Sequence, residues 1–204
     1  EDFSKMTSGT VNAPDGTDIA GSLDTYMQTA GWTGSQVYQA GGWCRIGSQS
    51  AAGSLTLPAL NCSRYDNEFA VVVNVKSVQG LTPVFSISAN GQTAKHRLTS
   101  TARTYLYQFT GGMSKTYITL ATSAERAFID SIVVVRGNGA TLYPDAKVIT
   151  VTGTPEIVET DVKDTDFMHV DTVAVTGVTT NSYVFTGLEA HTYYAFDVKA
   201  LCSY

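Results

Sequence analysis

The chain has 204 residues, with 13 basic and 18 acidic side chains and a formal charge of −5. Hydrophobic residues make up 43% and charged residues 15%, so the sequence can bury a core and is not a disordered acidic chain. The negative charge argues against a nucleic-acid partner, because phosphate binding needs a basic surface. No apolar run approaches the ~18 residues of a membrane helix, so we expect no membrane span in this chain.

The first 65 residues are rich in Gly, Ser and Thr. Residues 18–28 favour a short helix, for which Asp18 is the expected N-cap and Gly31 the expected stop signal. Residues 37–46 and 54–57 are expected to form short strands at the edge of the sheets.

From residue 69 onward the dominant hydrophobic period is two, which is typical of strands. Residues 69–78 form a β-branched run, and residues 83–89 alternate before Asn90-Gly91, a pair that favours a type I′ hairpin turn. Further strands are expected at residues 95–98, 105–109, 117–120 and 127–136. This spacing predicts an all-β protein whose first domain is a jelly-roll-like β-sandwich.

A domain boundary is expected near Gly137-Asn138-Gly139, with residues 1–137 as the first domain, 138–145 as a linker and 146–204 as the second. Residues 1–143 carry 10 basic and 9 acidic side chains, whereas residues 144–204 carry 3 and 9. The second unit also alternates, at residues 147–152, 172–176, 183–186 and 193–201. Such a change of charge supports two units with separate surfaces.

The second unit resembles a fibronectin type III domain over one strand pair. The pattern is carried by Leu188, Ala190, Thr192, Tyr194, Phe196, Val198 and Ala200. The resemblance implies a smaller β-sandwich in which Tyr194 forms the tyrosine corner. Only four residues follow Ala200, so the resemblance covers a partial or divergent domain.

The first unit resembles the jelly-roll domains of Bacteroidetes-type secreted surface proteins, which are similar in layout to carbohydrate-binding modules and galactose-binding-like sandwiches. The motifs are Asp2-Phe3-Ser4, Gly31-Trp32-Thr33-Gly34, Gly53-Ser54-Leu55-Thr56-Leu57-Pro58 and Ile129-Asp130-Ser131-Ile132. The resemblance implies an exported protein, located outside the cell or on its surface.

The three cysteines, Cys44, Cys62 and Cys202, allow at most one internal disulfide. Cys44 and Cys62 are close enough in sequence to close a short loop. The favoured interpretation is that they are buried free thiols on strands.

Asp130 lies within an apolar strand, and a buried carboxylate needs hydrogen bonds or a cation. The jelly rolls that the first unit resembles imply a structural calcium here, with Glu1 or Asp2 of the first strand as partners. The alternative is that Asp130 faces outward or bonds backbone amides of the N-terminal strand.

Three aromatic residues of the Gly-rich region, Trp32, Tyr38 and Trp43, are the candidates for stacking on a sugar ring. Gln39 and Arg45 are polar neighbours that could fix its hydroxyl groups. The alternative is that the two tryptophans close the end of the sandwich as core residues.

These observations favour a non-catalytic cell-surface module that binds a glycan or a surface protein. One alternative is a structural spacer or adhesion segment of a larger protein. Another is a fragment of a secreted glycoside hydrolase, which would need two carboxylates close together. The acids near strands are Glu68, Glu125 and Asp130, and the chain has no GxSxG, HExxH or P-loop motif.

Overall fold

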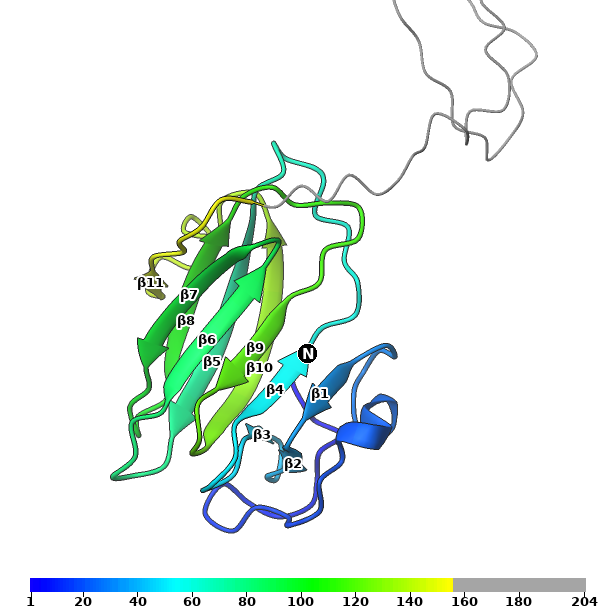
Figure 1. Cartoon of the computed structure of the whole chain (residues 1–204), viewed down its shortest axis with the longest axis vertical. Helices are drawn as coiled ribbons and strands as arrows, with labels where there is room; N and C mark the ends of the chain where they lie inside the picture. The colour runs from blue at the N-terminus through cyan, green and yellow to red at the C-terminus, as the bar shows by residue number, and fades with distance from the viewer. Residues whose placement is uncertain (156–204) are drawn as a thin grey trace, which may run out of the picture. The chain divides into compact units, whose positions relative to one another are not determined.

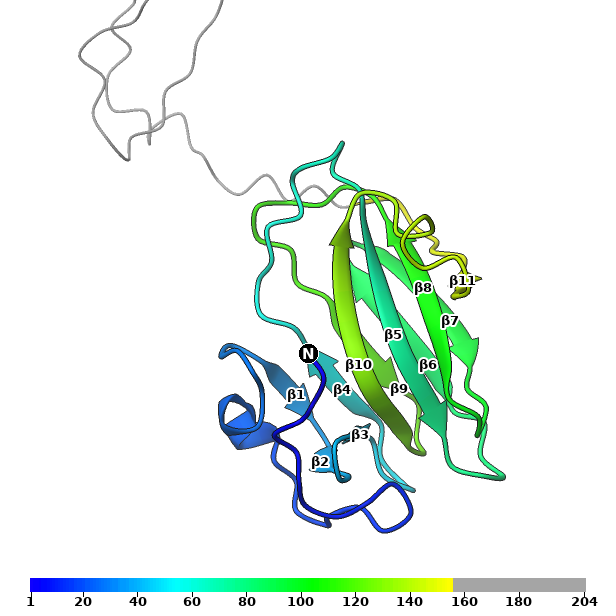
Figure 2. The same cartoon turned by 180° about the vertical axis from the view of Figure 1, so that it is seen from behind.

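The structure, a computed structural model, describes residues 1–155. They form a β-sandwich of two facing sheets, which confirms the all-β, jelly-roll-like expectation for the first domain (Figures 1 and 2). The chain divides into a first unit, Glu1–Val158, and a second, Glu159–Tyr204. The fibronectin-like motif at residues 188–200 lies outside the described residues and stays a prediction.

The Gly-rich N-terminal region forms short elements along the two sheets. They are η1 (Ala20–Thr25), β1 (Thr33–Ser35), β2 (Val37–Gln39), β3 (Cys44–Ile46) and β4 (Gly53–Thr56). The expected helix is only a short 3-10 helix, and its N-cap position is Ile19. Asp18 instead accepts hydrogen bonds from the backbone N–H groups of Ala20 and Val37, so it joins η1 to β2.

The five-stranded sheet has the order β1-β4-β9-β6-β7. Its further strands are β6 (Val84–Ala89), β7 (Gln92–Arg97) and β9 (Thr119–Thr122). The β6–β7 hairpin turns at Asn90-Gly91, whose φ angles are 48° and 73°, as a type I′ turn requires.

The six-stranded sheet has the order β11-β8-β5-β10-β3-β2. Its long strands are β5 (Phe69–Ser77), β8 (Arg103–Phe109) and β10 (Ala127–Arg136). β11 (Lys147–Ile149) pairs in parallel with β8, and Thr152 then exchanges backbone hydrogen bonds with Thr93 of the other sheet. The segment from 147 to 152, which the sequence assigns to the second domain, therefore contacts both sheets of the first.

The core lies between the sheets and is built from every second residue of the strands, whose side chains point inward. Phe69 and Phe109 stack with their ring centroids 5.2 Å apart, and Phe85, Tyr105 and Tyr107 are also buried. Cys44 and Cys62 are buried and free, as expected, but only Cys44 is on a strand, since Cys62 lies in the segment between β4 and β5. Burial raises the pKa of both thiols, so neither is an activated nucleophile.

His96 of β7 packs against the aromatic rings of the core and bonds one of them. Its Nε2 lies 2.6 Å from the Tyr107 hydroxyl, and its Nδ1 lies 3.2 Å from the carbonyl of Arg97. Because a carbonyl only accepts, Nδ1 carries the proton and the tyrosine donates to Nε2. Burial lowers the pKa of His96, which keeps the imidazole neutral.

Within the described residues, no helix is long and apolar enough to cross a membrane.

Candidate functional site

The outer face of the six-stranded sheet carries a row of aromatic and basic side chains at the end where β2 and β3 extend the sheet. The register places Lys76 of β5 opposite Phe128 of β10, Phe128 opposite Arg45 of β3, and Arg45 opposite Tyr38 of β2. Their chain neighbours point into the core, so alternation places these four on the opposite side of the sheet, where Phe128, Tyr38 and Arg45 are nonetheless buried. We call these four residues, together with Trp43, the aromatic–basic patch.

Arg45 and Tyr38 form a stacked pair at the edge of the patch. The guanidinium carbon of Arg45 lies 3.6 Å from the centroid of the Tyr38 ring, and both side chains are 8% exposed. The Tyr38 hydroxyl donates to Oε1 of Gln36 at 2.7 Å, which holds the ring in place. Burial lowers the pKa of Arg45, and the like charge of Arg126 adds to that effect.

Trp43 is the half-buried indole of the patch. The amino group of Lys76 lies 4.9 Å from its ring centroid, within the range of a cation–π contact. Trp43 immediately precedes β3, and its carbonyl accepts a hydrogen bond from the Ala40 N–H across the Gly41-Gly42 turn. The turn therefore fixes where the indole meets the sheet.

Several buried polar atoms on this side of the molecule have no hydrogen-bond partner among the described residues. They include Nε of Arg45, Nε of Arg126 and Oδ1 of Asn74. Asn74 lies on β5 two residues before Lys76, so it shares the outer face, and its amide nitrogen donates to Thr104 of β8. A buried polar atom left unpaired costs about 1–3 kcal/mol, so a ligand that supplied partners for these atoms would offset that cost.

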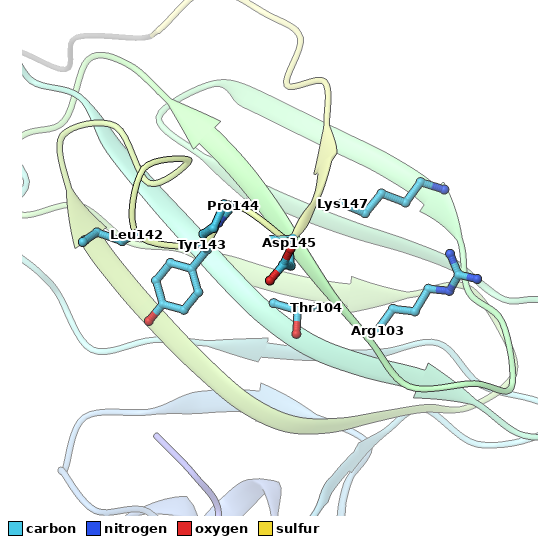
Figure 3. A pocket seen from close by; sticks show the side chains of 8 residues that line it. Arg103, Thr104, Leu142, Tyr143, Pro144, Asp145 and Lys147 are labelled. Atoms are coloured by element: carbon cyan, nitrogen blue, oxygen red, sulfur yellow. The ribbon is translucent and has the colours of Figure 1, made fainter.

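A pocket of about 420 Å³ opens on the same sheet face, beside β8 and β11. The loop before β11 lays Tyr143 and Asp145 over the strands, with Thr104 beneath and Arg103 and Lys147 at one end (Figure 3). Tyr143 also packs on the small apolar cluster of Ala70, Val72 and Leu106. Thr104 of this loop pocket bonds Asn74 of β5, and β5 is the strand that separates β8 from β10.

The outer face of the five-stranded sheet has a different chemistry. Its outward positions carry mostly hydroxyl side chains, and no strand of this sheet, within the described residues, turns an aromatic ring outward. The hydroxyls bond one another or the backbone, as in the contacts Ser35–Ser54 (3.0 Å) and Thr56–Thr119 (2.9 Å). Within the described residues, the outward aromatic rings therefore belong to the six-stranded sheet, and three of the four unpaired buried polar atoms lie on or next to it; the fourth is Oγ1 of Thr122 on β9.

Of the five predicted ligand-binding residues, the structure brings three together. Tyr38, Trp43 and Arg45 belong to the aromatic–basic patch. Trp32 is 8% exposed and belongs to the core between the sheets, as the alternative interpretation expected. Gln39 is also buried, and its Oε1 accepts a hydrogen bond from the Ser8 N–H, so it ties the N-terminal segment to β2.

The predicted metal ligands do not form a cluster. The Glu1 carboxylate accepts the N–H groups of Phe3 and Gln28, and Asp2 accepts the N–H of Ser4. Glu1 does pair with β10, through two backbone bonds to Ile132, but Asp130 occupies a break in the β5–β10 register. The described residues contain no group of three or more His, Cys, Asp or Glu side chains suited to a metal ion, and calcium binding stays a prediction.

The three acids considered for hydrolysis are spread along the β5–β10 pair. Glu68 precedes β5 and its carbonyl bonds Gly137 at one end, whereas Glu125 bonds Ser48 beyond the other end. Asp130 lies within β10, between these two ends.

Sequence reasoning missed Phe128, Lys76, Asn74 and Tyr143. Each looks ordinary in its own segment, because the pattern of β5 and β10 reads as a continuous apolar strand. Only the cross-strand register brings Lys76, Phe128 and Arg45 into one row. The signal available in the sequence was limited to the polar positions inside the apolar runs, such as Asn74.

Known proteins give a similarity of fold only. No family model matches the chain, and no curated protein matches it. Among solved structures, PfGH50B is 9% identical, with a TM-score of 0.43 over 56% of this chain and 24% of that one. The CBM1 module of BiXyn10A is 9% identical, with a TM-score of 0.42 over 52% and 90%. The CBM22-1 xylan-binding domain of Paenibacillus barcinonensis Xyn10C is 16% identical, with a TM-score of 0.40 over 64% and 90%.

The chain thus spans about a quarter of PfGH50B and most of each of the two modules. At this degree of similarity, the overlap carries no information on what this chain binds.

Proposed function

We propose that the first unit is a non-catalytic module that binds a glycan on the outer face of the six-stranded sheet. We further propose that it serves a protein outside the cell or on its surface. The observation that carries the proposal is the coincidence, on one face, of the rings of Tyr38 and Trp43 with the unpaired buried Arg45 Nε and Asn74 Oδ1.

The chemistry of a sugar matches this combination. A pyranose ring presents an apolar C–H face that packs on an aromatic ring, and hydroxyl groups that accept and donate hydrogen bonds at its rim. Trp43 is the half-buried ring available for packing, since Arg45 already covers one face of Tyr38. Asn74 on β5 and Arg45 on β3 belong to the same face, with β10 between them, and supply one acceptor and one donor.

The loop pocket extends this surface. Tyr143 offers a second half-buried ring, and Thr104 connects the pocket to Asn74 by a hydrogen bond of 3.2 Å. We infer that a chain of several sugar units lies across β8, β5 and β10, from Tyr143 toward Trp43. Spreading contacts over several units is how weak individual stacking contacts reach a measurable affinity.

The experiment is a binding titration of the whole chain against soluble neutral polysaccharides, namely xylan, β-1,4-galactan and a mixed-linkage β-glucan. We expect at least one of them to bind, and Trp43→Ala to weaken that binding by about tenfold or more, as the loss of a stacked ring costs about 1–3 kcal/mol. The matched control is Tyr117→Ala, because Tyr117 is 57% exposed and lies outside this face.

Equal losses in the two variants, or an affinity that Trp43→Ala leaves unchanged, would contradict this placement. If a folded protein binds no glycan of the panel, the spacer or protein-adhesion role gains weight. Repeating the titration in EDTA tests the predicted calcium, whose removal would weaken binding only if the ion supports the fold of this face.

A further inference from the structure

Two arginines, Arg45 of β3 and Arg126 next to β10, lie at the end of the aromatic–basic patch. Arg45 lies on β3 opposite Phe128 of β10, and Arg126 stands two residues before Phe128 on the same strand path. Alternation along an extended chain places Arg126 on the face that Phe128 occupies. Burial lowers the pKa of Arg45, and the positive charge of Arg126 lowers it further.

The charge on this pair is not matched by the chain. Nε of Arg45 and Nε of Arg126 are both buried and both lack an acceptor among the described residues. Arg45 is 8% exposed, and its Nε is a buried donor that has no acceptor among the described residues. Two positive charges close together in a poorly solvated position repel each other. An anion bound between them would attract both and so offset this repulsion.

The nearest carboxylates in the electrostatics of Arg45 are those of Asp15 and Asp18, and both are committed elsewhere. Asp15 accepts hydrogen bonds from the Ser8 hydroxyl and the Thr17 N–H. Asp18 accepts the N–H groups of Ala20 and Val37. They moderate the charge of Arg45 from a distance without bonding its free Nε.

We propose that the sugar bound on this face carries an anionic substituent, a carboxylate or a sulfate, which Arg45 and Arg126 hold from two sides. This inference rests on the proposed glycan-binding function and adds the class of glycan. An oxyanion has the planar or tetrahedral set of acceptors that a pair of guanidinium groups matches, and Trp43 and Lys76 lie on the same face for the ring that carries it.

The test compares three oligosaccharides of equal length with the whole chain: a neutral β-1,4-galactan, a polygalacturonate and a sulfated galactan. We expect at least one acidic oligosaccharide to bind about tenfold more tightly than the neutral one, with an affinity that falls as salt is raised. The two acidic probes separate a carboxylate from a sulfate as the substituent.

The variant Arg126→Gln should then reduce the preference for the acidic oligosaccharide by about tenfold, because it removes one charge-assisted contact. Arg126→Lys keeps the charge without the Nε donor and should restore part of the preference. Arg64→Gln is the matched control, since Arg64 is an exposed loop residue before β5. The proposal is supported if Arg126→Gln loses the preference for the acidic oligosaccharide and Arg64→Gln keeps it.

Two results would overturn it. If the neutral galactan binds as tightly as both acidic probes, the face recognises neutral sugars, and the glycan-binding function stands without this inference. If Arg126→Gln and Arg64→Gln change the acidic preference equally, the effect is one of overall charge and not of this pair. Failure of all three probes, together with the neutral panel above, would remove both proposals.

Discussion

Two tryptophans of the same Gly-rich region have opposite environments, and single residues next to them explain why. Trp32 follows Gly31, whose φ of 96° turns the chain inward, and its Nε1 donates to the Thr29 hydroxyl at 3.3 Å. Trp43 follows Gly41 and Gly42, which also have positive φ but lead directly into β3. The composition of the region suggested two equivalent stacking residues, yet the backbone turns decide which indole remains accessible.

The His96–Tyr107 pair gives a prediction at the same scale. Because burial lowers the pKa of His96 in the folded state, the unfolded chain binds a proton first as pH falls below its ordinary 6.5. The stabilisation by neutral His96 is therefore complete above pH 6.5 and declines as pH falls toward the lower folded value. The free energy of unfolding, measured with urea, should differ less between pH 7.5 and pH 5.5 for His96→Gln than for the wild type.

His169 and His191 are present in both proteins, so their contribution cancels in that comparison. Tyr107→Phe, which removes the hydroxyl bonded to Nε2, serves as a second probe of the pair and should destabilise the protein at pH 7.5 by about 1–3 kcal/mol. An identical pH dependence in His96→Gln and the wild type would show that His96 is not the group responsible.

At the scale of elements, alternation and turn chemistry predict the long strands well. β5, β6 and β10 match their predicted ranges closely, since each is a β-branched run bounded by turn residues. The expected strand at 37–46 is instead two strands, because Gly41 and Gly42 form a turn within it. β1 was not predicted, as three residues of Thr, Gly and Ser carry no hydrophobic period.

The site was less predictable than the strands for a physical reason. Tyr38, Trp43 and Arg45 are near one another in sequence, so their local pattern was visible. Lys76 and Phe128 join them only through the register between β5, β10 and β3, which is a long-range property of the sheet. The pairing of Glu1 with Ile132 of β10 is a long-range contact of the same kind.

The β6–β7 hairpin carries the prediction that belongs to this scale. Asn90 adopts a φ of 48°, and its side-chain amide donates to the Gly111 carbonyl at 2.7 Å. Asn90→Ala should destabilise the protein by about 1–2 kcal/mol, because alanine tolerates that φ poorly and the bond is lost. Asn90→Gly keeps the turn geometry and should cost less, as measured by urea unfolding; equal costs would mean that backbone strain at residue 90 contributes nothing.

At the scale of the whole molecule, the sandwich presents two chemically different outer faces. The outer face of one sheet carries hydroxyls that bond one another, and the outer face of the other carries largely buried rings and guanidinium groups with unpaired polar atoms. The segment around β11 strengthens this asymmetry, because it packs Tyr143 and Ala146 against the six-stranded sheet and leaves the other face uncovered by that loop (Figure 2). The sequence indicated a domain boundary near residue 137. It did not predict that the chain continues along the six-stranded sheet after that point.

The most direct test of the account is to map the bound glycan on the folded chain by amide chemical-shift changes during a titration with the oligosaccharide that binds best. We predict that the largest changes cluster on β2, β3, β5 and β10, around Tyr38, Trp43, Arg45 and Asn74, and extend to the loop pocket at Thr104. Changes that cluster on the hydroxyl face of β4, β6 and β9, or that spread evenly over both sheets, would contradict it.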